Sequence, residues 1–88
     1  MTPSIQVQLR FFASVREAIG AGTERLVTQA ATASELRDEL VARGGPWAER
    51  LVRGRAVRMA LDQEMLQDED TPLTDGCEVA FFPPVTGG

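Results

Sequence analysis

The sequence predicts an α+β domain in which one main helix packs across one face of a β-sheet. Two early strand patterns, one well-marked helix in the middle and later strands that end in a hydrophobic one indicate this class. The chain has 88 residues. A chain of this size buries roughly 60–68% of its unfolded surface, which allows one modest core. A large, enclosed active site is therefore not expected.

The front of the chain carries two strand patterns separated by a short helical segment. Apolar and polar residues alternate over residues 5–11, which is typical of a strand with one buried face. Residues 13–19 place their apolar side chains on one helical side, and Gly20 ends the segment. A second strand is expected near residues 24–28.

The main helix has a clear start signal. Thr32 and Glu35 have the spacing of a capping box, in which the hydroxyl accepts from one free N–H and the carboxylate from another. An apolar stripe continues over residues 36–41 and ends at the glycine pair 44–45. This is the best-marked helix of the sequence.

The back half predicts a brief helical segment and then more strands. Pro46 suits a first helical position, and Trp47 and Leu51 follow at a spacing of four. The expected elements after them are strands at 57–61 and 65–66, a polar turn at 68–72 and a strand at 78–82.

The last residues differ from the rest. Pro83 and Pro84 stop sheet pairing, because proline has no N–H to donate. The sequence therefore divides into a domain, 1–82, and a flexible tail, 83–88. Gly87 and Gly88 lack a Cβ, which lets a bare backbone enter a narrow channel and present the carboxylate of Gly88 to another protein. A frayed end is the alternative interpretation.

Composition excludes several classes of function. The net charge of −4 disfavours nucleic acid as a partner, and no apolar run approaches the roughly 20 residues of a membrane span. The first six residues lack a signal-peptide pattern, so we expect a cytoplasmic location. The single cysteine, Cys77, provides neither a disulfide nor a metal site. His, Tyr and Lys are absent, so few groups can act as a general acid or base.

Other side chains have two interpretations each. Cys77 could accept a persulfide, but an incidental small residue in an Asp-Gly turn is favoured. The cluster of Arg50, Arg53, Arg55 and Arg58 is interpreted as a solvated basic face and not as a grip for an acidic partner. The acidic residues Asp62, Glu64, Asp68, Glu69 and Asp70 lack EF-hand spacing and are interpreted as a solvated turn. Phe12 and Phe82 are out of phase with inward Phe11 and Phe81, so they are candidates for a partner interface, with a core position as the alternative.

The run from Asp75 to Gly88 resembles the C-terminus of the ubiquitin-like β-grasp sulfur carriers, the family that includes the small subunit of molybdopterin synthase. Weaker similarity covers residues 9–17 and 72–76. The resemblance implies a mixed sheet of about four to five strands, with one main helix across one face and an extended C-terminal tail. Cys77 departs from the family pattern, in which an acidic residue follows Asp-Gly.

The resemblance also implies a function. Gly88 would be adenylated with ATP by an E1-like adenylyltransferase and then converted to a thiocarboxylate, with sulfur from a cysteine desulfurase or a rhodanese-like protein. The large synthase subunit would accept the tail formed by Pro83, Pro84, Val85, Thr86, Gly87 and Gly88. Its sulfur would build the dithiolene of molybdopterin from cyclic pyranopterin monophosphate.

The active form implied is a heterotetramer, in which this chain is the sulfur-donating subunit of a sulfurtransferase and is inactive alone. No permanently bound cofactor or metal is expected, and the acyl-adenylate and thiocarboxylate are covalent states. The alternatives are a related carrier for thiamine, cysteine or tRNA thiolation, and a binding module whose glycines are incidental.

Overall fold

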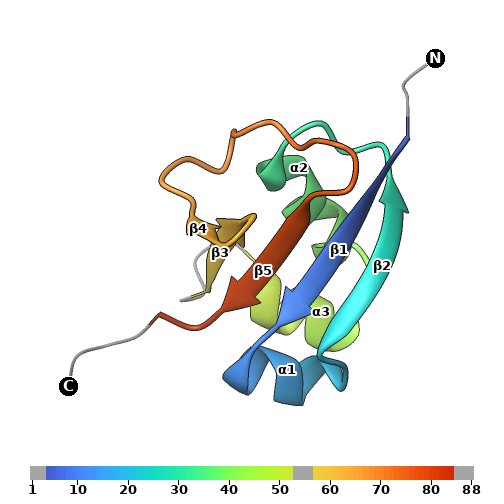
Figure 1. Cartoon of the computed structure of the whole chain (residues 1–88). Coiled ribbons are helices and arrows are strands. Elements are labelled where there is room, and N and C mark those ends of the chain that lie inside the picture. Colours follow the sequence, from blue (N-terminus) through green and yellow to red (C-terminus); the bar gives the residue numbers. More distant parts are fainter. Residues whose placement is uncertain (1–3, 53–56, 85–88) are drawn as a thin grey trace.

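The computed structural model describes residues 4–52 and 57–84. Within these residues, five strands form one mixed sheet in the order β2-β1-β5-β3-β4. The strands are β1 (Ile5–Phe11), β2 (Thr23–Thr28), β3 (Arg58–Leu61), β4 (Glu64–Met65) and β5 (Glu78–Phe82). Figure 1 shows α2 (Ala33–Val41) and α3 (Gly45–Leu51) behind the sheet, with the other face open. The α+β class and the β-grasp architecture are confirmed.

The first and the last of the five strands, β1 and β5, lie side by side in the middle of the sheet. β1 pairs in parallel with β5, and Leu9 lies opposite Val79. β2 is antiparallel to β1, and β3 is antiparallel to β5. The strand that leads into the tail is therefore held between two others and not at an edge.

Three stretches of helix follow the predicted positions. α1 (Ala13–Ile19) ends at Gly20, whose φ of 88° is the left-handed conformation that glycine adopts without strain. At the start of α2, the Thr32 hydroxyl accepts from the N–H of Glu35 at 3.2 Å. The Glu35 carboxylate accepts from the N–H of Ala31 at 2.9 Å, so the second bond of the predicted cap is made one residue before the N-cap Thr32.

The core lies between the sheet and α2 and α3. Its fully buried members include Leu9, Phe11, Val79 and Phe81 from the central strands and Leu36, Leu40 and Leu51 from the helices. Phe11 stacks on Phe81 with ring centroids 6.0 Å apart, and the edge of Trp47 meets Phe11 at 5.4 Å. Such aromatic pairs add about 0.5–1.5 kcal/mol to burial alone.

The second strand of the β3–β4 hairpin lies one residue earlier than the sequence predicted. β4 is Glu64–Met65, whereas residues 65–66 were expected. Asp62 and Gln63 both have positive φ, 49° and 72°, which is the conformation of a two-residue type I′ turn. This turn fixes the register by placing Leu61 opposite Glu64.

None of the helices in the described segments is long and apolar enough to cross a membrane.

Candidate functional site

The predicted tail begins directly after β5, the central strand of the sheet. β5 ends at Phe82, and the half-buried Pro83 and Pro84 follow it. The remaining predicted tail residues, Val85, Thr86, Gly87 and Gly88, lie outside the described residues. The function of the tail and the division into 1–82 and 83–88 stay predictions.

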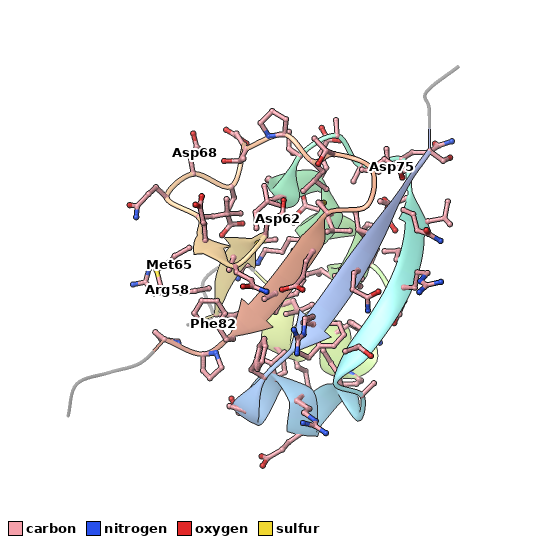
Figure 2. All side chains as sticks on the ribbon, viewed as in Figure 1. Arg58, Asp62, Met65, Asp68, Asp75 and Phe82 are labelled. Carbon is pink, nitrogen blue, oxygen red and sulfur yellow. The ribbon has the colours of Figure 1, made fainter. Side chains whose placement is uncertain are left out.

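The open face of the sheet near this point is defined by the strand register. One row across the sheet consists of Arg10, Ala80, Ala60 and Met65. The next row toward the tail contains Phe82 opposite Arg58. Phe12 directly follows β1, one position beyond the pair of Phe11 and Phe81. Figure 2 shows Met65, Arg58 and Phe82 together along the same side of the sheet.

These residues include an apolar surface near the end of β5, which we call the outer patch. It consists of Phe12, Ala60, Met65, Ala80 and Phe82. Phe12 is 42% exposed and Met65 is 53% exposed, whereas the alanines between them are buried at 8% and 6%. A contiguous apolar surface on a small protein is typical of an interaction site.

The predicted phase of the two phenylalanine pairs is confirmed. Phe11 and Phe81 are buried, Phe12 is exposed and Phe82 is half-buried. An interface role for Phe12 and Phe82 stays a prediction. Met65 was not singled out from the sequence. Its exposure follows from its pairing with Ala60, and the Asp62-Gln63 turn that sets this register was the missing signal.

Backbone strain occurs beside the patch. Ala13 has φ of 50°, a left-handed conformation that costs a non-glycine residue about 1 kcal/mol. The N–H of Phe12 donates to the carbonyl of Phe81 at 3.2 Å, so the chain is still attached to β5 just before this turn. The carbonyl of Phe12 accepts from Val15 and Arg16 in the first turn of α1. Hydrogen bonds of both its N–H and its carbonyl therefore fix the backbone of Phe12.

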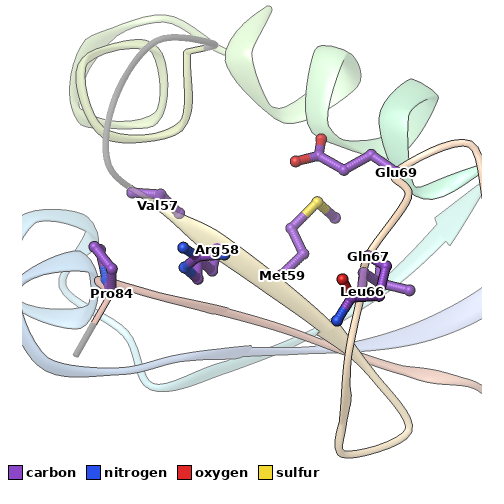
Figure 3. A pocket seen from close by; sticks show the side chains of 7 residues that line it. All are labelled: Val57, Arg58, Met59, Leu66, Gln67, Glu69 and Pro84. Carbon is purple, nitrogen blue, oxygen red and sulfur yellow. The ribbon is translucent and has the colours of Figure 1, made fainter. Parts of the chain in front are cut away.

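A cavity of about 340 Å³ opens beside the root of the tail. Its lining consists of Val57, Arg58, Met59, Leu66, Gln67, Glu69 and Pro84. Figure 3 shows the side chains of Met59 and Glu69 pointing into the space between β3 and the helices, with Pro84 at the other end. Glu69 already accepts from Arg37 at 2.7 Å, so the carboxylate in this cavity is bound within the fold.

Cys77 directly follows the Asp75-Gly76 turn, and it packs inward from there. Its side chain is 3% exposed and belongs to the hydrophobic core. Burial raises the pKa of the Cys77 thiol, which keeps it in the unreactive neutral form. A persulfide-accepting role therefore gains no support from the structure.

The acidic run is not wholly a solvated turn, as the sequence had suggested. Glu69 binds the buried Arg37, Asp68 accepts from the N–H of Asp70 at 2.9 Å, and Asp62 accepts from the N–H of Glu78 at 2.9 Å. These carboxylates shape the loop and the hairpin. Within the described segments, no group of three or more His, Cys, Asp or Glu side chains is placed to bind a metal ion.

The structure separates the described members of the predicted arginine cluster. Arg50 is exposed on α3, on the helical side of the sheet, whereas Arg58 lies on the open face opposite Phe82. Arg53 and Arg55 lie outside the described residues. A single basic face made by Arg50 and Arg58 is therefore not formed.

Comparison with known proteins places this architecture in a family. A model of the ThiS family matches residues 9–88. The molybdopterin synthase sulfur carrier subunit of Escherichia coli is 42% identical over 82 residues, which cover 93% of this chain and 99% of that protein.

Solved structures agree with this assignment. The HVO 2177 protein of Haloferax volcanii has 29% identity and a TM-score of 0.81, and the match covers 97% of this chain and 88% of that one. A chain in the complex of subunits 1 and 2 of molybdopterin-converting factor from Helicobacter pylori has 30% identity and a TM-score of 0.66, with coverage of 96% and 100%. The protein therefore belongs to the ThiS family, with a ubiquitin-like β-grasp fold.

Proposed function

We propose that this chain is the sulfur carrier subunit of a molybdopterin synthase and that Gly88 carries the sulfur as a C-terminal thiocarboxylate. One observation carries the proposal. Similarity to a curated sulfur carrier subunit covers 99% of that protein, and the family match extends through the glycine pair to residue 88. The arrangement of the domain supports it, because the central strand β5 leads directly into Pro83 and Pro84.

The proposed chemistry begins with activation of the carboxylate. A carboxylate is a poor electrophile, so its oxygen first attacks the α-phosphorus of ATP, and pyrophosphate leaves. The terminal sulfur of a persulfide on the donor protein then attacks the acyl carbon of the adenylate, and AMP leaves. A cysteine thiol next attacks the donor's own sulfur in the resulting acyl disulfide, which breaks the S–S bond, leaves a disulfide on the donor and releases the acyl group with its sulfur. The product is a thiocarboxylate whose ionised sulfur is a soft nucleophile. An E1-like adenylyltransferase and a cysteine desulfurase or rhodanese-like protein are the proposed partners for these steps.

The second stage takes place in the large subunit. That subunit accepts the tail, shields the sulfur from water and orients it toward cyclic pyranopterin monophosphate. The composition of this chain is consistent with such a division, because it contains no His, Lys or Tyr to act as an acid or base. The outer patch, beside the root of the tail, is the proposed docking surface for the large subunit.

Intact mass spectrometry of the protein from its own host tests the carrier role. We expect a species in which one oxygen of the C-terminal carboxylate is replaced by sulfur. When each form is mixed with the large subunit, only this species should support molybdopterin formation. Deletion of the gene and rescue by the wild-type chain separate the alternatives. Rescue of thiamine synthesis or tRNA thiolation, without an effect on molybdopterin, would favour the related carriers instead.

A further inference from the structure

Two guanidinium groups border the outer patch, although the chain as a whole has a net charge of −4. Arg10 lies opposite Ala80 at one side, and Arg58 lies opposite Phe82 at the other. Both belong to the open face, because their strand neighbours Leu9 and Met59 point into the core. The apolar surface is therefore flanked by positive charge on two sides.

Arg10 is only loosely held by its own chain. Its Nη1 lies 3.7 Å from Oε1 of Glu78, and its side chain is 42% exposed. Charge-assisted hydrogen bonds between these groups are normally about 2.7–2.9 Å long, so this pair is a weak one. The same guanidinium lies 5.4 Å from the ring centroid of Phe12, which keeps it beside the patch. Its donors remain available to a carboxylate on another protein.

We propose that the outer patch selects a partner surface on which an apolar contact is flanked by carboxylates, one facing Arg10 and one facing Arg58. The partner is the large subunit, so this inference rests on the proposed function. Charges at the edge of an interface act mainly on the association rate and its salt dependence, whereas apolar contacts at the centre hold the complex together. The two arginines therefore steer the encounter and fix its orientation.

The chain offers a matched control on the same face. Arg25 lies in β2 opposite Gln8, and its side chain is exposed, but it is outside the outer patch and its border. Arg10→Glu, Arg58→Glu and Arg25→Glu each change the net charge by the same amount. The association rate of each full-length variant with the purified large subunit is measured at low salt and at about 0.15 M salt.

We expect Arg10→Glu and Arg58→Glu each to lower the rate at low salt by about tenfold, and Arg25→Glu by less than about twofold. The double variant Arg10→Lys/Arg58→Lys should keep most of the wild-type rate, because charge steers at long range. Glu78→Gln should raise the rate, since it removes the competing carboxylate beside Arg10.

Three outcomes overturn the inference. They are equal rates for the Arg25 variant and the two border variants, loss of the rate in the double lysine variant, and a wild-type rate that does not fall as salt is added. The salt dependence of the wild-type rate needs no variant, so it tests the inference even if a charge reversal unfolds the domain. Absence of any binding by the wild-type chain would overturn the proposed function together with this inference, whereas normal sulfur transfer with equal rates overturns this inference alone.

Discussion

The guanidinium of Arg37 donates to the carboxylate of Glu69 across 2.7 Å. Its Nε also donates to the carbonyl of Leu51 at 2.6 Å, and the Arg37 side chain is only 5% exposed. One buried cation therefore joins α2 to the last residue of α3 and to the loop that leads toward β5. Removal of one member of such a buried arrangement costs more than loss of a surface pair, because a desolvated group loses its partner.

Arg37→Met should lower the free energy of unfolding by about 2–4 kcal/mol, since the methionine fills the space but donates to neither acceptor. Urea unfolding followed by far-UV circular dichroism measures this change. Arg25→Met, at an exposed position on the sheet, is the control and should change the free energy by less than about 0.5 kcal/mol. Equal effects of the two substitutions would show that the buried contacts of Arg37 contribute little.

The Arg37 contacts show where prediction from sequence stops. The cap of α2 and the burial of Leu36 and Leu40 are local consequences of spacing, and they were predicted. Arg37 follows Leu36 directly and looks like a solvent-facing residue of an amphipathic helix. Its partner Glu69 is 32 residues away in an acidic run, so only the closed fold brings the two together.

The ion pair between Glu24 and Arg43 should make stability depend on pH. The side-chain hydrogen bonds from Arg43, 3.0 and 2.6 Å long, lower the pKa of Glu24 from its ordinary value of 4.5. A carboxyl group whose pKa is lower in the folded state stabilises the fold above its unfolded pKa. That contribution is lost as the pH falls through the folded pKa.

Comparison of Glu24→Gln with the wild type isolates this pair. At about pH 7 the variant should be less stable by about 0.2–1 kcal/mol, the range for a surface pair, because both side chains are about 30% exposed. The difference should shrink toward zero as the pH falls below 4.5. Thermal unfolding over this pH range is the measurement, and a difference that stays constant or grows in acid would contradict the assignment. Arg43 is left intact because it also lies over the ring of Trp47 at 4.4 Å.

The outer patch should be required for association and not for folding. Phe82→Asp and Met65→Asp place a charge at two positions of this surface, and each should abolish stable binding to the large subunit. Val27→Asp is the control, because Val27 is 63% exposed and lies opposite Gln6 on the same face, in the outermost strand. Titration calorimetry measures binding, and the melting temperature of each isolated variant checks the fold. A Phe82→Asp variant that unfolds would show that this half-buried ring belongs to the core.

The candidate site could also be predicted only in part, because some of its residues come together only in the folded sheet. The phase of Phe12 and Phe82 follows from the period of two in a strand, and Pro83 and Pro84 mark the end of β5. Met65 and the border arginines were not assigned to this surface, because their positions depend on which strands are neighbours. The order β2-β1-β5-β3-β4 places β3 and β4 beside the last strand, and no local pattern states that order.

The end of the chain should be essential for sulfur transfer and almost irrelevant to stability. Deletion of Gly88, or addition of one residue after it, should leave the far-UV spectrum and the melting temperature nearly unchanged, because chain ends contribute little to a core. Sulfur transfer should be lost. One added residue moves the carboxylate by about 3.3–3.6 Å along an extended chain. A displacement of about 1 Å can already cost on the order of a hundredfold in rate. Molybdopterin formation with the large subunit is the measurement, and an added segment before Met1 is the control that should be tolerated. If the extended chain, shown by mass to be unprocessed, still formed molybdopterin at the wild-type rate, the reacting sulfur could not reside on the carboxylate of Gly88.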